Sequence, residues 1–250
     1  MDKDIYFVSD SHFKPIPNHG EEERRQLFFD FLDQIKPRAG KLFLVGDVFD
    51  FWFEYKYVIP KYLFDVLHKL QELARADCEI NILGGNHDYW LGSFFSDNLI
   101  KPYQEDIEIE LDNKLFLITH GDGKLNIDPF YPYLKKIIRN EFVIKVFRLL
   151  HPDIAFKIAD LVSRSSRSQD PDTSPELEQF YKQKIEQFCK RAFKNNFDFI
   201  VTGHYHYPTR YDLEGSTFIN LGDWVRHFTY GRFSKGKLYL ENFSEQSKVY

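Results

Sequence analysis

Short apolar runs alternate with longer amphipathic stretches along most of the chain. Five runs of four or five residues, rich in Ile, Val, Leu and Phe, have the length and composition of buried strands. They lie at residues 5–8, 41–45, 80–83, 115–118 and 197–201. The stretches 21–35 and 62–75 separate the first three runs and are expected to be helices. This alternation predicts an α/β fold that contains βαβ units and a parallel sheet.

The C-terminal part of the chain has a different pattern. Four short strand-like segments, 208–213, 216–221, 228–233 and 237–243, follow one another closely. Two of the connections contain the dipeptides Glu214-Gly215 and Lys235-Gly236, which are typical of tight hairpin turns. We therefore expect an antiparallel meander that closes a second sheet.

Polar side chains that can bind metal ions follow each of the five strand-like runs. They are Asp10, His12, Asp47, Asn86, His120, His204 and His206. In the Asp-x-His and His-x-His pairs, alternation along an extended chain places both side chains on one face. Because open α/β sheets bind ligands beyond the carboxyl ends of their strands, we expect all seven side chains at one edge.

This set of carboxylate, amide and imidazole groups, without cysteine, suits borderline-hard ions such as Mn, Fe, Zn or Co. The Asp47 carboxylate is the natural bridge between two ions. Two such ions, about 3.5–4 Å apart, clamp the attacking and leaving oxygens of a phosphoryl displacement. A single histidine is more often a packed or surface residue than a ligand. We assign that structural role to the four histidines that lie outside the ligand motifs, which are His19, His68, His151 and His227.

The five motifs that carry these residues occur in one order. They are Asp10-Ser11-His12, Gly46-Asp47-Val48-Phe49-Asp50, Gly85-Asn86-His87-Asp88, Thr119-His120-Gly121-Asp122 and Gly203-His204-Tyr205-His206. Together they resemble the calcineurin-like metallophosphoesterase superfamily, and the resemblance extends to Asn220-Leu221-Gly222. It implies a four-layer α/β/β/α sandwich with a dinuclear site between two sheets.

The resemblance also implies a role for each residue. One ion would take Asp10, His12, Asp47 and His206, and the other Asp47, Asn86, His120 and His204. His87 would lie beside the leaving group, oriented by Asp50, and two Mn ions are the expected cofactors.

Within the superfamily the chain most resembles the UDP-2,3-diacylglucosamine hydrolases of lipid A biosynthesis. The similarity lies in its length, the Gly46 to Trp52 turn, Asp128 eight residues after His120, and an inserted helical segment. It implies hydrolysis of a lipid-linked sugar nucleotide to UMP and 2,3-diacylglucosamine 1-phosphate. The residues expected to contact substrate are Asn86, His87, Asp128, Arg164, Ser166, Arg167 and His204. Many members carry Arg and Glu where this chain has His87 and Asp50, the pairing of general phosphoesterases.

The inserted segment 129–168 differs in charge from the rest of the chain. It contains eight basic residues and three acidic ones, a local charge of +5, whereas the whole chain carries −5. Its apolar residues lie close to helical spacing, which predicts a pair of basic amphipathic helices. Such helices suit a membrane surface or a lid over acyl chains. The alternative is a pair of helices packed on the core with a solvated basic face. The polar stretch after them, which contains Arg164, Ser166 and Arg167, either provides hydrogen-bond donors to a pyrophosphate or is a linker.

Length and composition support one domain over residues 1–250, with 129–168 as an inserted lid. The N-terminus has no signal-peptide pattern, and no apolar run approaches the roughly 20 residues that span a bilayer. We therefore expect a cytoplasmic protein, peripheral on the inner membrane. The two cysteines, Cys78 and Cys189, have no metal-type spacing and are expected to be buried free thiols rather than a disulfide.

Two other functions are compatible with the motifs. One is a calcineurin-like phosphatase or phosphodiesterase that acts on a soluble phosphoester, which the His87 and Asp50 pairing favours. The other is a binding scaffold without catalysis, for which loss of ligands would be expected, although this chain retains them all. An acidic chain without a long basic groove argues against nucleic-acid cleavage. The oligomeric state does not follow from the sequence.

Overall fold

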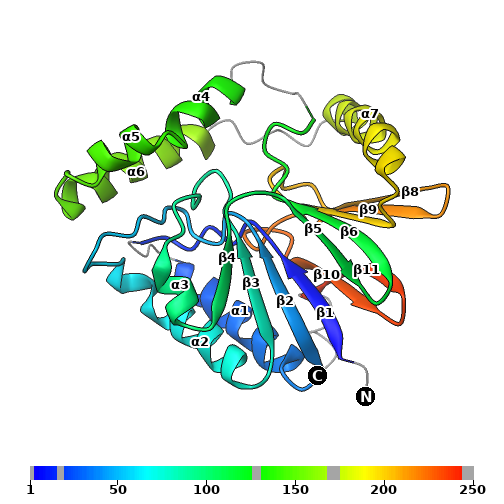
Figure 1. Ribbon diagram of the computed structural model, residues 1–250, viewed down its shortest axis with the longest axis horizontal. Helices are drawn as coiled ribbons and strands as arrows, with labels where there is room; N and C mark the ends of the chain where they lie inside the picture. The colour runs from blue at the N-terminus through cyan, green and yellow to red at the C-terminus, as the bar shows by residue number, and fades with distance from the viewer. Residues whose placement is uncertain (1–2, 16–19, 126–130, 168–174, 244–250) are drawn as a thin grey trace.

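The computed structural model describes residues 3–15, 20–125, 131–167 and 175–243. Two sheets form the centre of the molecule (Figure 1). The first has the order β11-β10-β1-β2-β3-β4. Its strands are β1 (Asp4–Val8), β2 (Ala39–Val45), β3 (Glu79–Leu83), β4 (Ile100–Tyr103), β10 (Thr229–Ser234) and β11 (Lys237–Asn242). The first four are parallel to one another, as the alternation of strands and helices predicts.

The second sheet has the order β5-β6-β7-β9-β8. Its strands are β5 (Ile107–Leu111), β6 (Lys114–Thr119), β7 (Phe199–Thr202), β8 (Thr209–Leu213) and β9 (Ser216–Asn220). Strands β6, β7 and β9 are parallel, so that β6 and β7 both end at the same edge.

Helices cover the outer faces of both sheets. The first sheet is covered by α1 (Glu21–Ile35), α2 (Phe64–Arg75), which follows a 3-10 turn at Lys61–Leu63, and the short α3 (Ser93–Asp97). The second sheet is covered by α7 (Pro175–Ala192), which ends in a 3-10 turn at Phe193–Asn195. Both helices expected in the first part of the chain are therefore confirmed.

Alternating side chains divide the interior into three apolar layers. On β1, Tyr6 and Val8 pack toward α1 and α2, whereas Ile5 and Phe7 pack between the sheets. On β7, Val201 joins the layer between the sheets and its neighbour Ile200 packs toward α7. Period-two alternation thus gives each sheet two apolar faces, and the four-layer sandwich is confirmed.

The expectation of one C-terminal meander in the second sheet is wrong. Only the β8–β9 hairpin joins that sheet, and the β10–β11 hairpin pairs with the edge of β1 in the first sheet. Between the hairpins, Gly222 has φ 73° and Trp224 is fully buried against Phe28 and Phe31 of α1. Burial of this indole carries the chain across to the first sheet, where β10 covers an otherwise unpaired strand edge.

The inserted segment forms three helices rather than two. They are α4 (Tyr131–Ile138), α5 (Glu141–Phe147) and α6 (Pro152–Arg167), which lie together above the sheets at the upper left of the view (Figure 1). The side chain of Asn140 caps α5 and separates it from α4. Pro152, at the first position of α6, separates that helix from α5. The expected boundaries of the segment, 129 and 168, lie outside the described residues.

Both cysteines are buried free thiols, as expected. Burial raises the pKa of Cys78 and of Cys189 to about 12.

Candidate metal centre

The predicted metal-binding residues all lie just past the carboxyl ends of strands. Asp10 and His12 follow β1, Asp47 follows β2, and Asn86 follows β3, all from the first sheet. His120 follows β6, and His204 and His206 follow β7, from the second sheet. The carboxyl ends of the parallel strands therefore bring seven side chains from two sheets to one place.

Five of these residues have a left-handed backbone. The φ angles are 54° at Asp10, 45° at His12, 51° at Asp47, 72° at His204 and 50° at His206. Asp, Asn and His adopt this conformation more readily than other residues, but it still costs about 1–3 kcal/mol where the structure imposes it. Such strain clusters at functional sites. Here it occurs at five of the seven predicted metal-binding residues.

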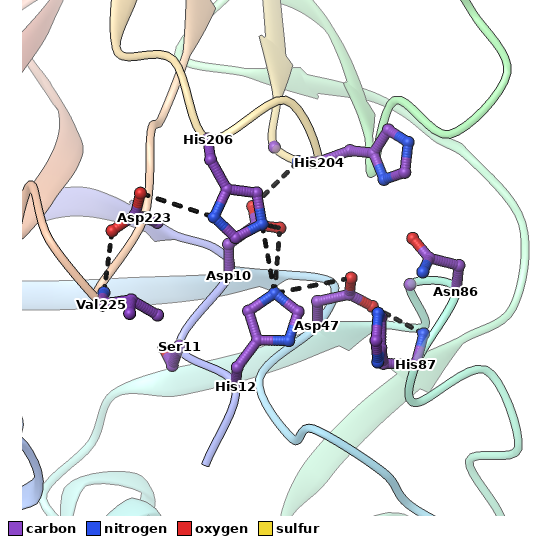
Figure 2. A network of polar contacts seen from close by, with 12 residues as sticks. Asp10, Ser11, His12, Asp47, Asn86, His87, His204, His206, Asp223 and Val225 are labelled. Carbon is purple, nitrogen blue, oxygen red and sulfur yellow. Dashed lines mark hydrogen bonds and ion pairs between the residues drawn. The ribbon is translucent and has the colours of Figure 1, made fainter. Parts of the chain in front are cut away.

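The first group of convergent atoms belongs to Asp10, His12 and His206. The two Nε2 atoms of His12 and His206 lie 3.3 Å apart. Asp10 Oδ1 lies 3.5 Å from His206 Nε2 and 3.8 Å from His12 Nε2, and it is buried without a hydrogen-bond partner among the described residues. Figure 2 shows the contacts that join this carboxylate and the His206 ring to His12. Two imidazole nitrogens and an unsatisfied carboxylate oxygen that face one another fit a divalent cation.

The second group belongs to Asp47, His120 and His204. His120 Nε2 lies 3.3 Å from Asp47 Oδ2 and 3.1 Å from Asn86 Oδ1. The other nitrogen, Nδ1, lies 3.0 Å from the carbonyl oxygen of Val45. Because that carbonyl can only accept, Nδ1 carries the proton and Nε2 offers its lone pair to the site.

Asp47 belongs to both parts of the site. Its Oδ2 atom lies 3.3 Å from His120 Nε2 and 3.8 Å from His12 Nε2, so the same oxygen faces both groups. Its Oδ1 atom accepts a hydrogen bond from the backbone N–H of His87, at 2.8 Å. The structure thus places Asp47 where the sequence predicts a bridging carboxylate.

The pKa values of the site reflect its concentration of negative charge. Burial alone would lower the pKa of His12 and of His120, but neighbouring carboxylates raise both to about 10. These are Asp10, Asp50 and Asp47 for His12, and Asp47, Asp10 and Asp122 for His120. Burial alone would raise the pKa of Asp10 and of Asp47, yet the neighbouring histidines lower both. In the absence of metal, protons on imidazoles therefore balance the buried carboxylates, a role that cations can take over.

His87 lies at the edge of this site. Its ring contacts that of His12 edge-to-face, with centroids 4.9 Å apart. Its Nδ1 atom lies 3.0 Å from the carbonyl oxygen of Asp50, whereas the Asp50 carboxylate is 4.0 Å away. That carboxylate is turned toward His12 Nδ1, at 3.6 Å, so the closer contact of His87 is the Asp50 backbone rather than the expected side chain. Burial lowers the pKa of His87, which favours the neutral imidazole.

Two carboxylates that the sequence analysis gave no role support the site. Asp223 Oδ2 lies 3.4 Å from His206 Nδ1 and 2.8 Å from Nδ1 of His227. His227 is one of the four histidines to which the sequence gave only a structural role. Asp88 is fully buried and accepts backbone N–H groups from Asp47 and two other residues of that turn, and from Gly85. Both follow strand ends, the same signal that identifies Asp47.

The inserted helices are anchored beside the site. The buried Asp122, two residues after His120, accepts a hydrogen bond from Tyr131 at 2.8 Å and pairs with Lys135 at 2.7 Å. Arg139, just past the end of α4, reaches the same carboxylate at 3.5 Å. The indole N–H of Trp90 donates to the carbonyl of Ile138, at 3.1 Å. Helix α4 is thus held to the loop that carries His120.

The aromatic turn after Asp50 contributes differently at each position. Trp52 is fully buried in the core against Phe49 and Phe95, so it does not face a substrate. Phe51 and Phe53 instead pack against Phe147 and other residues of α5 and α6. Of the expected substrate contacts, Asp128 and the side chains of Arg164, Ser166 and Arg167 lie outside the described residues.

Comparison with known proteins points to the same chemistry. The family model of calcineurin-like phosphoesterases matches residues 3–208. A protein of Porphyromonas gingivalis named UDP-2,3-diacylglucosamine hydrolase is 28% identical, over 98% of this chain and 99% of its own. One of the same name from Haemophilus influenzae is 27% identical, over 90% of this chain and 92% of its own. Among solved structures, a novel archaeal phosphodiesterase is similar with a TM-score of 0.47 and 14% identity, covering 96% of this chain and 99% of its own.

Proposed function

The chain belongs to the calcineurin-like phosphoesterase family and is a hydrolase, and from that premise we propose that two metal ions support its cleavage of UDP-2,3-diacylglucosamine. The products are UMP and 2,3-diacylglucosamine 1-phosphate. The two relatives named for this substrate, which match most of the chain, support its identity. The observation that supports this reaction is the arrangement of two groups of Asp and His side chains, both of which face Asp47 Oδ2.

Each ion has a defined set of residues in this proposal. One is held by Asp10, His12, Asp47 and His206, and the other by Asp47, Asn86, His120 and His204. Bound divalent ions supply Lewis-acid stabilisation of the phosphoryl oxygens and a reactive water near neutral pH. The donor set accepts several borderline-hard ions. Mn is the proposed metal among them because the family resemblance favours it.

His87 is the proposed acid or electrostatic group beside the leaving phosphate. The Asp50 carbonyl fixes one proton on Nδ1, so Nε2 donates to a phosphate oxygen when the imidazole takes up a second proton. Burial lowers the pKa of His87, and an anionic substrate beside it raises that pKa and favours the protonated form. Asn86 and His204, from the same site, complete the proposed substrate contacts within the described residues. Asp128 and, from the inserted segment, Arg164, Ser166 and Arg167 remain proposed contacts.

The inserted helices suit the lipid part of the proposed substrate. A cavity of about 730 Å³ lies between α5, the residues that flank it and the loops at 53–56 and 89–93. Phe53, Trp90 and Ile144 line it together with Arg139 and Arg148. The apolar side chains offer contacts for acyl chains and the arginines for a diphosphate, beside the acidic Glu54 and Glu141 of the same lining.

The outward face of the same helices suits a membrane surface. Several of its apolar side chains are exposed, including Phe142 at 74% and Leu149 at 86%. Lys136, Lys145 and Lys157 are exposed beside them. Exposed apolar area next to cations favours binding at an anionic bilayer surface. Among the described residues, no helix is both long and apolar enough to cross a bilayer. We therefore propose peripheral contact with the cytoplasmic face of the inner membrane, made through α4, α5 and α6.

The membrane proposal has its own test. The Phe142→Glu, Leu149→Glu double variant should lose sedimentation with vesicles of anionic phospholipid. The control variant Tyr57→Glu changes an exposed aromatic residue outside the inserted segment and should sediment like the wild type. Equal sedimentation of all three proteins would contradict the proposed contact.

Turnover of UDP-2,3-diacylglucosamine in detergent with added Mn tests the proposed function. It should be compared with turnover of bis-p-nitrophenyl phosphate and with the His120→Ala variant of the same chain. Release of UMP by the wild type alone, with slow cleavage of the generic diester, is the expected result. Cleavage of the generic diester only would retain the metal site and favour a soluble phosphoester, the alternative that His87 suggests. Full activity of the His120→Ala variant would refute the two-metal site.

A further inference from the structure

A single arginine holds the backbone of the turn that carries Asp10 and His12. Arg24 lies on α1 with a side chain that is only 12% exposed, and its guanidinium donates to four acceptors. These are the carbonyl oxygens of Ser11, of His12 at 3.2 Å and of Trp224 at 3.3 Å, and Glu21 Oε2 at 2.6 Å. Glu21 is itself buried, so the arginine charge is neutralised where it lies.

This turn needs support because its conformation is unfavourable. Asp10 and His12 both have positive φ, with one residue between them. Their amide groups donate to the carbonyls of Gly46 and Asp47, at 3.1 and 2.9 Å, which fixes the N–H side of the turn. The carbonyls of Ser11 and His12 point the other way, toward α1, where Arg24 receives them.

Arg24 also joins this turn to the segment behind His206. The carbonyl of Trp224 accepts from Arg24, and the amide of Trp224 donates to the Asp10 carbonyl at 3.1 Å. The preceding residue, Asp223, faces His206. One guanidinium therefore ties together the backbone on both sides of the group formed by Asp10, His12 and His206.

We propose that Arg24 is a positioning residue that sets the metal affinity of the Asp10, His12 and His206 group. This inference rests on the proposed metal-binding function. Arg24 contacts carbonyls rather than ligand side chains, and acts by holding the left-handed turn in the conformation that aims Asp10 and His12 at one point. A planar fork of five donors can serve three carbonyls and a carboxylate together, which a lysine ammonium cannot do.

The neighbouring Arg25 provides a matched control. Its side chain is 6% exposed, and it donates to the carbonyls of Lys14 and Tyr62, at 2.8 and 2.5 Å. It also pairs with Asp65 at 2.9 Å and with Glu21 at 3.2 Å. Arg25 is therefore a buried arginine on the same helix with equivalent partners, but none of its acceptors lies in the turn between Asp10 and His12.

The test compares the wild type with Arg24→Gln and Arg25→Gln in the full chain. Mn(II) affinity and stoichiometry are measured by electron paramagnetic resonance and by competition with a chelating dye. Thermal stability is measured on the metal-free proteins. Both variants should lose stability, because each loses a buried arginine. Only Arg24→Gln should bind one Mn(II) more weakly, by about 10- to 100-fold, and lose the spin-coupled signal of a metal pair.

Equal Mn(II) affinity of the two variants would overturn the role of Arg24 while leaving the metal site intact. A wild type that binds no Mn(II), Zn(II) or Co(II) would instead refute the proposed function, and the inference with it. If Arg24→Gln does not fold, Arg24→Lys tests the role of Arg24 instead. It keeps the charge beside Glu21 but not the fork, and should still bind one ion more weakly than the wild type. Wild-type affinity in Arg24→Lys would overturn the proposal.

Discussion

Replacement of Asp223 by Asn should impair the metal site through the tautomer of His206. The carboxylate accepts three backbone N–H groups at Oδ1, from Val225, Arg226 and His227, at 2.8, 2.6 and 3.2 Å. An amide oxygen can accept the same three bonds, so the turn should persist. The NH₂ group then replaces Oδ2, 3.4 Å from His206 Nδ1.

That exchange reverses the polarity of the contact. In the wild type, Oδ2 can only accept, so His206 carries its proton on Nδ1 and offers the lone pair of Nε2 to the site. An amide NH₂ can only donate, which favours the tautomer protonated on Nε2, with its proton pointed at Asp10 and His12. Loss of such a supporting contact lowers metal affinity by about 10- to 100-fold, or about 1.4–2.7 kcal/mol.

The assay is Mn(II) binding by the metal-free protein, with the His206 tautomer assigned by nitrogen-15 NMR. His227→Ala is the control, since it removes the other partner of Oδ2, at 2.8 Å, and leaves His206 with its carboxylate. Asp223→Asn should bind one ion weakly, and His227→Ala should bind both ions as the wild type does. Unchanged affinity in Asp223→Asn, or an Nδ1 proton retained on His206, would refute the reasoning.

Four further predictions concern the metal ions, His87, Gly85 and Asp122. Chelation should lower Tm by roughly 10–20 °C, because two ions at 100 times Kd each contribute about 2.7 kcal/mol; calorimetry with and without EDTA measures this, and an unchanged Tm would contradict it. His87→Ala should lower kcat about 10²- to 10⁴-fold at unchanged metal content, and a silent variant would remove its role. Gly85→Ala should lower metal content measured by elemental analysis, because a Cβ there would overlap the Asp47 side chain and backbone nitrogen; wild-type content would contradict this. Burial alone would raise the pKa of Asp122, but His120 and Lys135 hold it below its usual value. Its pairing with α4 is therefore present at neutral pH and lost as pH falls through that lowered value. Hydrogen-exchange protection of α4, corrected for the intrinsic exchange rate at each pH, should fall at acid pH in the wild type, and an Asp122→Asn variant should lack the change.

The strands and the residues that follow them could be predicted because both signals are local. A run such as 41–45 is apolar enough to be buried, and Asp47 follows it directly, so its position depends on a few adjacent residues. The resemblance then supplied the four-layer arrangement, which the three apolar layers confirm. The helices at 21–35 and 64–75 were equally predictable from their own composition.

The errors arose where distant segments compete for one partner. The β10–β11 hairpin has the same local pattern as β8–β9, and only the burial of Trp224 beside α1 assigns it to the first sheet. Trp52 packs in the core against Phe49 and Phe95, whereas Phe51 and Phe53 on either side of it pack against the inserted helices. No pattern within the 51–53 segment distinguishes these two outcomes.

The sequence by itself determined which side chains can hold metal ions, since motif order and strand ends are properties of the chain. Only the tertiary structure decided what orients them. Asp223 lies behind His206, Arg24 lies behind the Asp10 turn, and the Asp50 carbonyl rather than its carboxylate is closest to His87. These contacts join residues as far apart as 24 and 224. Each requires a backbone carbonyl or a side chain to point in one particular direction. Such geometry exists only after the two sheets and α1 have packed together.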